Sequence, residues 1–160
     1  MPPAGPEDRV RGPDAAPLVI VYADFECPYC AALELRLTQA DLRVCFRHFP
    51  VRAKHPRAWA AAQAAEAAAL QDAFWPMHDA LFADQGRLED PHLWARAEQL
   101  GLDVDRFHRD ARSDAAKARV QHDFRTGIRA GVIATPTLFL PDGERISGRP
   151  DAAVWDRLDA

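Results

Sequence analysis

A pair of cysteines at the end of an apolar run is the feature that most constrains this chain. Residues 17–24 read PLVIVYAD, a short stretch rich in β-branched residues that is typical of a strand buried on both faces. Cys27 and Cys30 follow almost at once, in the sequence FECPYC. Pro28 favours the first position of a helix, because its fixed φ suits that position and it has no N–H to leave unpaired. The expected order is therefore strand, cysteine pair, helix.

Two thiols at this spacing could belong to a zinc site, a structural cross-link or a redox dithiol. A zinc site needs four ligands, and neither Cys45 nor the six histidines supply a second pair at metal spacing. A disulfide across one helical turn would constrain little of the unfolded chain. We therefore expect no metal and no cofactor, and interpret Cys27 and Cys30 as a redox dithiol.

The start of the predicted helix gives the two sulfurs different roles. Cys27 falls at the N-cap, where its sulfur faces free backbone N–H groups and the positive end of the helix dipole. Both favour the thiolate over the thiol. Cys30 lies one turn along, near enough to form a disulfide but more enclosed. We expect Cys27 to be the exposed attacking sulfur and Cys30 the sheltered resolving one.

Length and charge exclude several other classes of protein. The chain has 160 residues, the usual size of one domain, and is large enough to bury a core without cross-links. Its net charge of −4 gives no electrostatic reason to bind nucleic acid. No apolar stretch approaches the roughly 20 residues that cross a bilayer, so we expect no membrane span.

The first 16 residues contain four prolines and two glycines, and we expect them to form a flexible N-terminal segment. They contain no apolar region of the kind that signal peptides have. We expect a cytoplasmic protein. The alternative is a periplasmic or otherwise extracytoplasmic protein whose leader has been removed.

The remaining pattern predicts an α/β core that a block of helices interrupts. A helix from about residue 27 to 39 and an alternating strand, RVCFRHFP, over residues 43–50 follow the first strand. Residues 56–131 are helical throughout, and PTLFL, a PDG turn, ERIS and a last helix complete the chain. We expect the core to comprise residues 17–55 and 132–160, with residues 56–131 as an inserted helical domain.

Five segments of the chain carry a resemblance to a known family. They read DFECPYC, FRHFP, AFWPMHDALF, LGLD and GVIATPTLFL. In them the chain resembles the DsbA-like family of thioredoxin-fold thiol-disulfide oxidoreductases and, more loosely, relatives that stand alone or are attached to sodium/proton antiporters. The resemblance implies a thioredoxin-like fold with an inserted helical domain. It also implies that Cys27 is the nucleophile, that Cys30 resolves, and that Thr135 precedes a cis-proline, Pro136, whose loop lies against the dithiol.

The dipeptide inside the motif departs from that of DsbA. Pro28 and Tyr29 stand where DsbA has Pro-His, so the imidazole that helps to stabilise its thiolate is missing. Asp24 and Glu26, if close, would oppose a thiolate further. Thioredoxin and DsbA differ in reduction potential by about 150 mV, roughly 7 kcal/mol for this two-electron couple. We expect this chain to be a weaker oxidant than DsbA.

The function that the resemblance implies is disulfide exchange with protein thiols and disulfides, carried out by a monomer. Glutathione or a redox partner protein are further expected partners. A glutathione-dependent reductase or isomerase of the kappa type stays open as an alternative, although a kappa-type transferase would not need Cys30. A non-catalytic chaperone or regulatory module is the other alternative.

The remaining reactive and aromatic residues have simpler structural interpretations. Cys45, in mid-strand, is expected to be a small buried hydrophobic residue, with a regulatory thiol as the alternative. Glu34 matches an acidic position in some family members, but a solvated helix charge is the simpler interpretation. Surface or structural roles are favoured over contact with the dithiol for three polar residues, Arg47, His48 and His55. Core positions are favoured over a substrate groove for six aromatic residues: Trp59, Phe74, Trp75, Phe82, Trp94 and Phe107.

Overall fold

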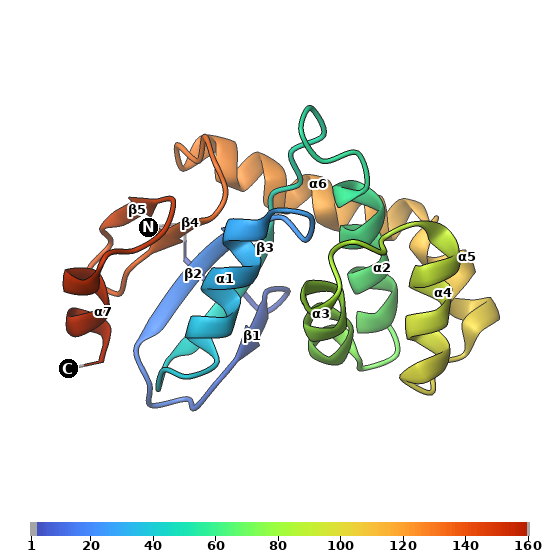
Figure 1. The fold of residues 1–160 in the computed structure, drawn as a ribbon, viewed down its shortest axis with the longest axis horizontal. Helices are drawn as coiled ribbons and strands as arrows, with labels where there is room; N and C mark the ends of the chain where they lie inside the picture. The colour runs from blue at the N-terminus through green and yellow to red at the C-terminus, as the bar shows by residue number, and fades with distance from the viewer. Residues whose placement is uncertain (1–2, 160) are drawn as a thin grey trace.

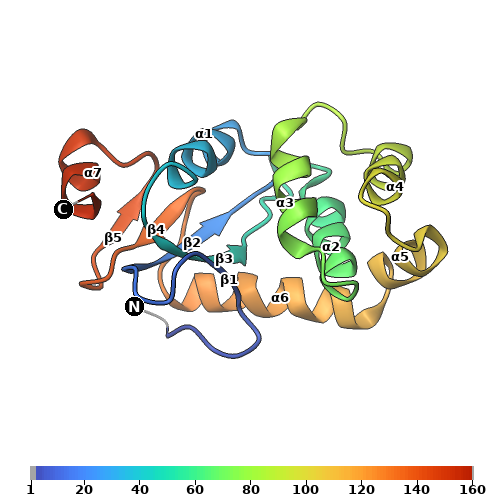
Figure 2. The same ribbon diagram turned by 90° about the horizontal axis from the view of Figure 1, so that it is seen from below.

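Residues 3–159, which the computed structural model describes, form one five-stranded sheet with helices on both faces (Figures 1 and 2). The strands lie in the order β1-β3-β2-β4-β5. They are β1 (Arg9–Arg11), β2 (Leu18–Ala23), β3 (Arg43–His48), β4 (Thr137–Phe139) and β5 (Arg145–Ser147). The helices are α1 (Pro28–Leu37), α2 (Ala58–Ala69), α3 (Phe74–Ala83), α4 (Asp90–Gln99), α5 (Val104–Ala111), α6 (Asp114–Arg129) and α7 (Ala152–Leu158).

The central strand β2 is buried on both faces, as its apolar run predicts. It pairs in parallel with β3 and antiparallel with β4, and β4 pairs antiparallel with β5. Val19, Ile20 and Val21 are fully buried because α1 and α3 cover one face of the sheet while α6 covers the other (Figure 2). The predicted α/β class is therefore confirmed, and so, from β2 onward, is the predicted order strand-helix-strand, helices, strand-strand-helix.

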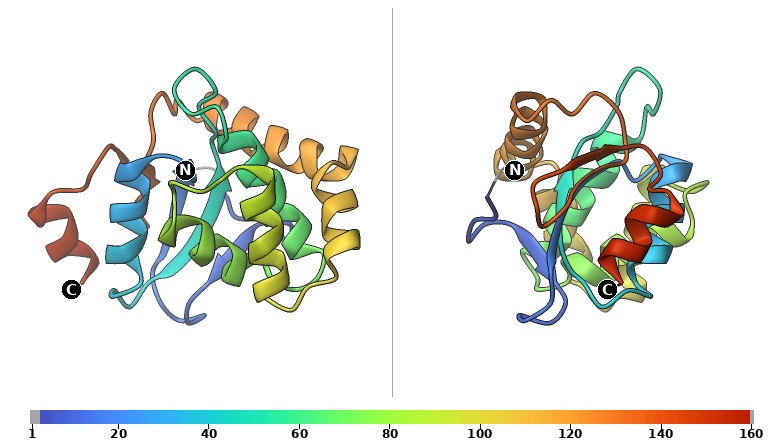
Figure 3. Two further views of the ribbon diagram at one scale, coloured as in Figure 1. Left: turned by 45° about the vertical axis from the view of Figure 1, so that its right-hand side comes forward. Right: turned by 90° about the vertical axis from the view of Figure 1, so that its left-hand side faces the viewer.

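Five helices, α2 to α6, lie between β3 and β4 in the sequence. They gather at one end of the sheet, whereas α7 packs at the other end, beside α1 (Figures 1 and 3). α6 also runs along the sheet and contacts β3 (Figure 2). The block is thus more closely joined to the core than a separate domain, and its boundaries at residues 56 and 131 stay a prediction. None of the helices in residues 3–159 has both the length and the apolar character that crossing a membrane requires.

Strand β1 lies within residues 1–16, which were expected to form a flexible N-terminal segment, so at least this part of the segment is ordered. Arg9–Arg11 pair antiparallel with β3 and form an edge of the sheet. Arg9 forms an ion pair with Glu66 of α2, and Arg11 with Asp79 of α3 at 2.9 Å. These partners lie 57 and 68 residues away in the sequence. A local pattern of prolines and glycines could not reveal them.

Buried charges join β3 to the helices, and each has a partner. His48 Nε2 lies 2.7 Å from Glu66 Oε1, and the backbone N–H of His48 donates to Asp123 of α6 at 3.1 Å. Burial opposes ionisation of Glu66, but the hydrogen bonds from His48 and Arg9 outweigh it and lower the pKa of Glu66 from 4.5 to about 2. The carboxylate therefore stays ionised inside the protein and holds β1, β3 and α2 together.

Gly127 allows α6 to pack closely on the sheet. A Cβ atom at this position would lie 2.7 Å from Phe49 Cδ2 and 3.0 Å from Tyr22 Cδ1. Both distances are shorter than carbon–carbon van der Waals contact, which is about 3.5–4.0 Å. The hydroxyl of Tyr22 also lies 3.0 Å from that of Thr126, so a hydrogen bond holds the helix at the same point.

We expect Gly127→Ala to lower the free energy of unfolding by about 1–3 kcal/mol, because the added methyl group overlaps the rings of Phe49 and Tyr22. At an open helical position the same change stabilises by about 1 kcal/mol. Chemical denaturation measures the difference. His122→Ala, at an exposed position of the same helix, serves as the control and should change stability by less than about 0.5 kcal/mol. A more stable Gly127→Ala variant would contradict this packing.

Candidate active site

The cysteine pair lies where β2 ends and α1 begins. Cys27 is the N-cap of α1, with extended backbone angles of φ −79° and ψ 120°, as the sequence predicts. Its carbonyl oxygen accepts hydrogen bonds from the N–H groups of Cys30 and Ala31 at 3.1 and 3.2 Å. The N–H of Asp24 donates to Cys30 Sγ at 3.5 Å. The junction therefore holds both sulfurs at the C-terminal end of the central strand.

Cys27 is less open than expected. It is 3% exposed and Cys30 is fully buried, so the expected order of exposure holds but the margin is small. Cys27 Sγ lies 3.6 Å from the carbonyl oxygen of Thr135, and the loop that precedes β4 covers it. Pro28 and Tyr29 are exposed, Tyr29 to 60%. The surface of the motif is thus formed by the dipeptide rather than by the sulfurs.

The loop that precedes β4 is fixed against the dithiol. The Thr135–Pro136 peptide bond is cis, and Pro136 is buried. The N–H of Gly148 donates to the carbonyl oxygen of Pro136 at 2.8 Å, and the hydroxyl of Thr137 donates to that of Ala134 at 2.7 Å. The fold thus brings Thr135 to the attacking cysteine, from which it is 108 residues distant in the sequence.

The two thiols of the pair have opposite pKa shifts. The hydrogen bond from the Cys30 thiol is the largest cause that lowers the pKa of Cys27 from 9.0 to about 6, burial opposes it, and backbone N–H groups of Cys30 and Tyr29 assist. Burial raises the pKa of Cys30 well above 9.0, and the adjacent Cys27 raises it further. Near neutral pH the pair therefore consists of a thiolate and a thiol.

The two carboxylates that precede the motif are engaged by the loop after β3. Asp24 is buried and accepts hydrogen bonds from the N–H groups of Glu26 and Val51, both at 2.8 Å. It also lies 2.8 Å from His55 Nδ1. Glu26 accepts from the N–H of Arg57 at 2.8 Å. Neither carboxylate is among the main influences on the pKa of the attacking thiol.

Gln85 is a site residue that the sequence analysis missed. Its side-chain amide donates to the carbonyl oxygens of Phe25 and Cys27 at 2.9 and 2.8 Å. It belongs to the loop after α3, 58 residues from Cys27, so it fastens the helical block to the N-cap. A lone glutamine in a loop is part of no motif, and the sequence held no signal for it.

Three polar candidates have mainly structural partners. Arg47 binds the carboxylate of Asp8 at 2.8 Å, and His48 is engaged with Glu66. Only His55 reaches the dithiol region, through Asp24. A structural role is thus what the contacts of Arg47 and His48 provide.

The structure confirms the expected burial of Cys45 but not the expected exposure of Glu34. Cys45 is fully buried in β3, as expected, and burial raises the pKa of its thiol to about 12. Glu34 is 3% exposed, so the interpretation as a solvated helix charge is wrong. Its carboxylate faces α3 and β1, where it lies 3.4 Å from His78 Nε2 and 3.5 Å from the guanidinium of Arg11. These partners compensate the negative charge of Glu34, which is buried between α1, α3 and β1.

The aromatic residues of the helical block are mostly core, as expected. Phe74 and Phe107 are buried, and Trp75, Phe82 and Trp94 pack, partly buried, against the same core. Trp59 does so too but also lines an open groove. Within residues 3–159, no three side chains of the types His, Cys, Asp and Glu gather in a way that could hold a metal ion.

A family model described as thioredoxin matches residues 5–158 of the chain. The chain belongs to the thioredoxin family. Solved structures show the same fold. A thioredoxin-like oxidoreductase from Silicibacter pomeroyi, 22% identical, covers 96% of this chain and 91% of its own with a TM-score of 0.85. The thiol-disulfide exchange protein alpha-DsbA2 from Wolbachia pipientis, 18% identical, covers 95% and 86% with a TM-score of 0.80.

The curated relatives that the chain matches are longer proteins. The Na(+)/H(+) antiporter NhaA of Herminiimonas arsenicoxydans is 45% identical over 159 residues, which cover 94% of this chain and 25% of the antiporter. NhaA 3 of Salinispora tropica is 44% identical over 155 residues, which cover 92% and 24%. The chain of this thioredoxin-family protein therefore spans about a quarter of the length of the curated relatives it matches.

We expect rapid alkylation of Cys27 alone in the reduced protein, with a rate that rises with pH and reaches half its maximum near pH 6. Below that pH the thiolate is protonated, so the rate should fall about tenfold per pH unit. A short iodoacetamide pulse followed by peptide mass spectrometry measures it. Cys45 is the internal control, because its raised pKa and burial should leave it unlabelled. A midpoint near 9, or first labelling of Cys30, would contradict the assignment.

Proposed function

We propose that this chain is a thiol-disulfide oxidoreductase that exchanges disulfides with protein substrates. The observation that carries the proposal is the placement of the pair at the start of α1, where Cys27 is the N-cap, 3.6 Å from the Thr135 carbonyl oxygen, and Cys30 is buried. In this placement the pKa of Cys27 is lowered and that of Cys30 is raised. A low-pKa thiolate next to a protonated thiol suits the two successive steps of disulfide exchange. The fold shared with solved oxidoreductases is consistent with this activity.

The reduced protein acts in two steps. The Cys27 thiolate attacks one sulfur of a substrate disulfide, forms a mixed disulfide and releases the other substrate sulfur as a thiolate. The Cys30 thiol then loses its proton and attacks Cys27 Sγ, which releases the second substrate thiolate. The protein is left with a Cys27–Cys30 disulfide, so two electrons have passed to the substrate. The reverse sequence oxidises a substrate dithiol.

Thr135 and the exposed dipeptide of the motif surround the sulfur that the substrate must reach. No backbone hydrogen bond within residues 3–159 uses the N–H of Thr135, and its carbonyl oxygen faces Cys27 Sγ. We propose that Thr135, held by Pro136, pairs with an extended substrate segment as one strand pairs with another. Pro28 and Tyr29 form the adjoining surface. Protein thiols are the proposed partners, and the chain is proposed to act as a monomer.

We expect the reduction potential to lie between that of thioredoxin, about −270 mV, and that of DsbA, about −120 mV. A lower pKa of the attacking cysteine stabilises the reduced form, and the value of about 6 for Cys27 falls between thioredoxin, about 7, and DsbA, about 3.5. Equilibration with glutathione redox buffers, followed by quantification of the Cys27–Cys30 disulfide, measures the potential. A value at or above that of DsbA would contradict the expected order.

We expect Cys30→Ser to accumulate mixed disulfides on Cys27, because the resolving thiol is gone while the attacking thiolate remains. Insulin reduction measures activity, and non-reducing gel electrophoresis with mass spectrometry locates the adduct. Cys45→Ser is the matched control and should keep most of the activity, since Cys45 lies on β3.

The same variants test the alternatives. Activity that persists in Cys30→Ser with glutathione as the only thiol would favour the kappa-type enzyme. If the wild-type protein does not reduce insulin but assists the refolding of a cysteine-free client, a chaperone would be favoured.

A further inference from the structure

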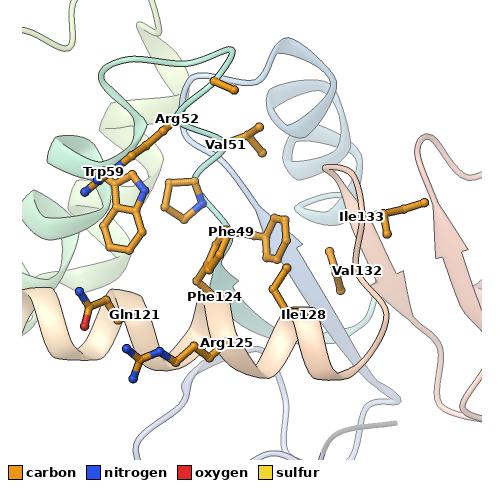
Figure 4. A pocket seen from close by; sticks show the side chains of 12 residues that line it. Phe49, Val51, Arg52, Trp59, Gln121, Phe124, Arg125, Ile128, Val132 and Ile133 are labelled. Carbon is orange, nitrogen blue, oxygen red and sulfur yellow. The ribbon is translucent and has the colours of Figure 1, made fainter.

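An open groove of about 610 Å³ lies between the loop after β3, helix α6 and the loop that precedes β4 (Figure 4). Aromatic rings form its base. Phe49 and Phe124 stack with ring centroids 4.6 Å apart, and Trp59 lies 6.1 Å from Phe124. Such a base offers flat apolar surface to an aromatic or large aliphatic side chain.

The two isoleucines that line the groove are exposed to solvent. Ile128 is 54% exposed and Ile133 is 88% exposed, two of the five large hydrophobic residues that are exposed within residues 3–159. Both line the groove, together with its aromatic base. Single exposed apolar residues are common, but a patch of them around a hollow is typical of a binding surface.

The charges at the groove have one sign. Arg52 and Arg125 line it, and no Asp or Glu does, although the whole chain has a net charge of −4. Arg52 lies 4.5 Å above the ring of Trp59. In the part of the chain that the structure describes, neither guanidinium forms an ion pair, whereas Arg9, Arg47 and Arg119 all do. Two unpaired cations beside an apolar base are complementary to a ligand that carries a carboxylate next to an apolar group.

Two chain segments that line the groove lead directly to the residues around the dithiol. Ile133 precedes Thr135 by two residues, and the Thr135 carbonyl oxygen lies 3.6 Å from Cys27 Sγ. Phe49, at the base of the groove, donates its N–H to the carbonyl oxygen of Ala23 at 2.9 Å, directly before the turn that carries the dithiol. A polypeptide whose cysteine reaches Cys27 therefore has neighbouring residues within reach of the groove.

We propose that this groove binds the segment of a protein substrate next to its reacting cysteine and selects a large apolar residue adjacent to Asp or Glu. The proposal rests on the proposed disulfide exchange and adds the class of substrate to it. The apolar side chain lies on Phe49, Phe124 and Trp59, while the carboxylate is attracted by Arg52 and Arg125, whose side chains lie on opposite sides of this aromatic base (Figure 4). The two contacts hold the substrate cysteine at the Thr135 loop.

The test uses three matched peptides, each supplied as a symmetrical disulfide dimer. One carries Phe-Asp two to five residues from its cysteine, placed on each side in turn. The second carries Phe-Lys and the third Ser-Asp at the same positions. The reduced protein converts each dimer into two peptide thiols and acquires its own disulfide, so chromatography of the thiols over time gives the second-order rate constant of this single turnover. Rates are divided by that for 2-hydroxyethyl disulfide, which carries no charge and is too small to fill the groove.

We expect the Phe-Asp peptide, on at least one side of the cysteine, to react at least five times faster than the Phe-Lys and Ser-Asp peptides. Arg52→Glu/Arg125→Glu should reverse the preference, so that the Phe-Lys peptide becomes the faster substrate. Arg129→Glu makes the same kind of change at an exposed position of α6 that does not line the groove. This matched control should retain the wild-type preference.

Each of the other outcomes would refute a different part of the proposal. Equal normalised rates for all peptides would refute the groove but leave disulfide exchange intact, whereas no reaction with any disulfide would refute the proposed function itself. A preference that survives in the double variant, or that Arg129→Glu abolishes equally, would refute the assignment to Arg52 and Arg125. Equal rates together with a dimer in sedimentation that Ile133→Ser dissociates would assign the groove to a second copy of the chain instead.

Discussion

The carboxylate of Asp24 is the contact on which the geometry of the dithiol depends. It is buried at the end of the central strand, where its two oxygens bind the N–H groups of Glu26 and Val51 and the ring of His55. An unpaired carboxylate at this depth would be strongly destabilising, so these donors fix the turn and the loop after β3 to each other. The backbone of the same residue contacts Cys30 Sγ through its N–H.

The lowered pKa of Cys27 follows from hydrogen bonds rather than from added positive charge. The DsbA-like imidazole is missing, and a tyrosine that is 60% exposed stands in its place. The pKa of Cys27 is nevertheless lowered, chiefly by the Cys30 thiol and with the help of backbone N–H groups, because the N-cap position directs these donors at one sulfur. Burial of Cys30 keeps that donor protonated. The protonated thiol of Cys30 thus stabilises the thiolate of Cys27.

Patterns within a few residues revealed most of the fold and the dithiol, whereas contacts between distant segments stayed hidden. An apolar run followed by C-P-x-C predicts strand, N-cap and helix because each step is a local preference. β1 and Gln85 were missed, since a strand of three residues and a loop glutamine acquire their roles from partners that are distant in the sequence. Glu34 was misjudged for the same reason: α1 alone cannot show that α3 and β1 bury its carboxylate.

Phe49 contributes to two surfaces at once, and this limits how the protein can diverge. One part of its ring forms the base of the groove, and another part lies where a side chain at Gly127 would otherwise be. A smaller residue at 49 would deepen the groove but leave a void under α6, and a larger one would displace the helix. Positions 49 and 127 should therefore covary among homologues. Arg52 and Ile133, on loops outside the packed layers, are free to change one at a time, so selectivity can drift there without disturbing the fold.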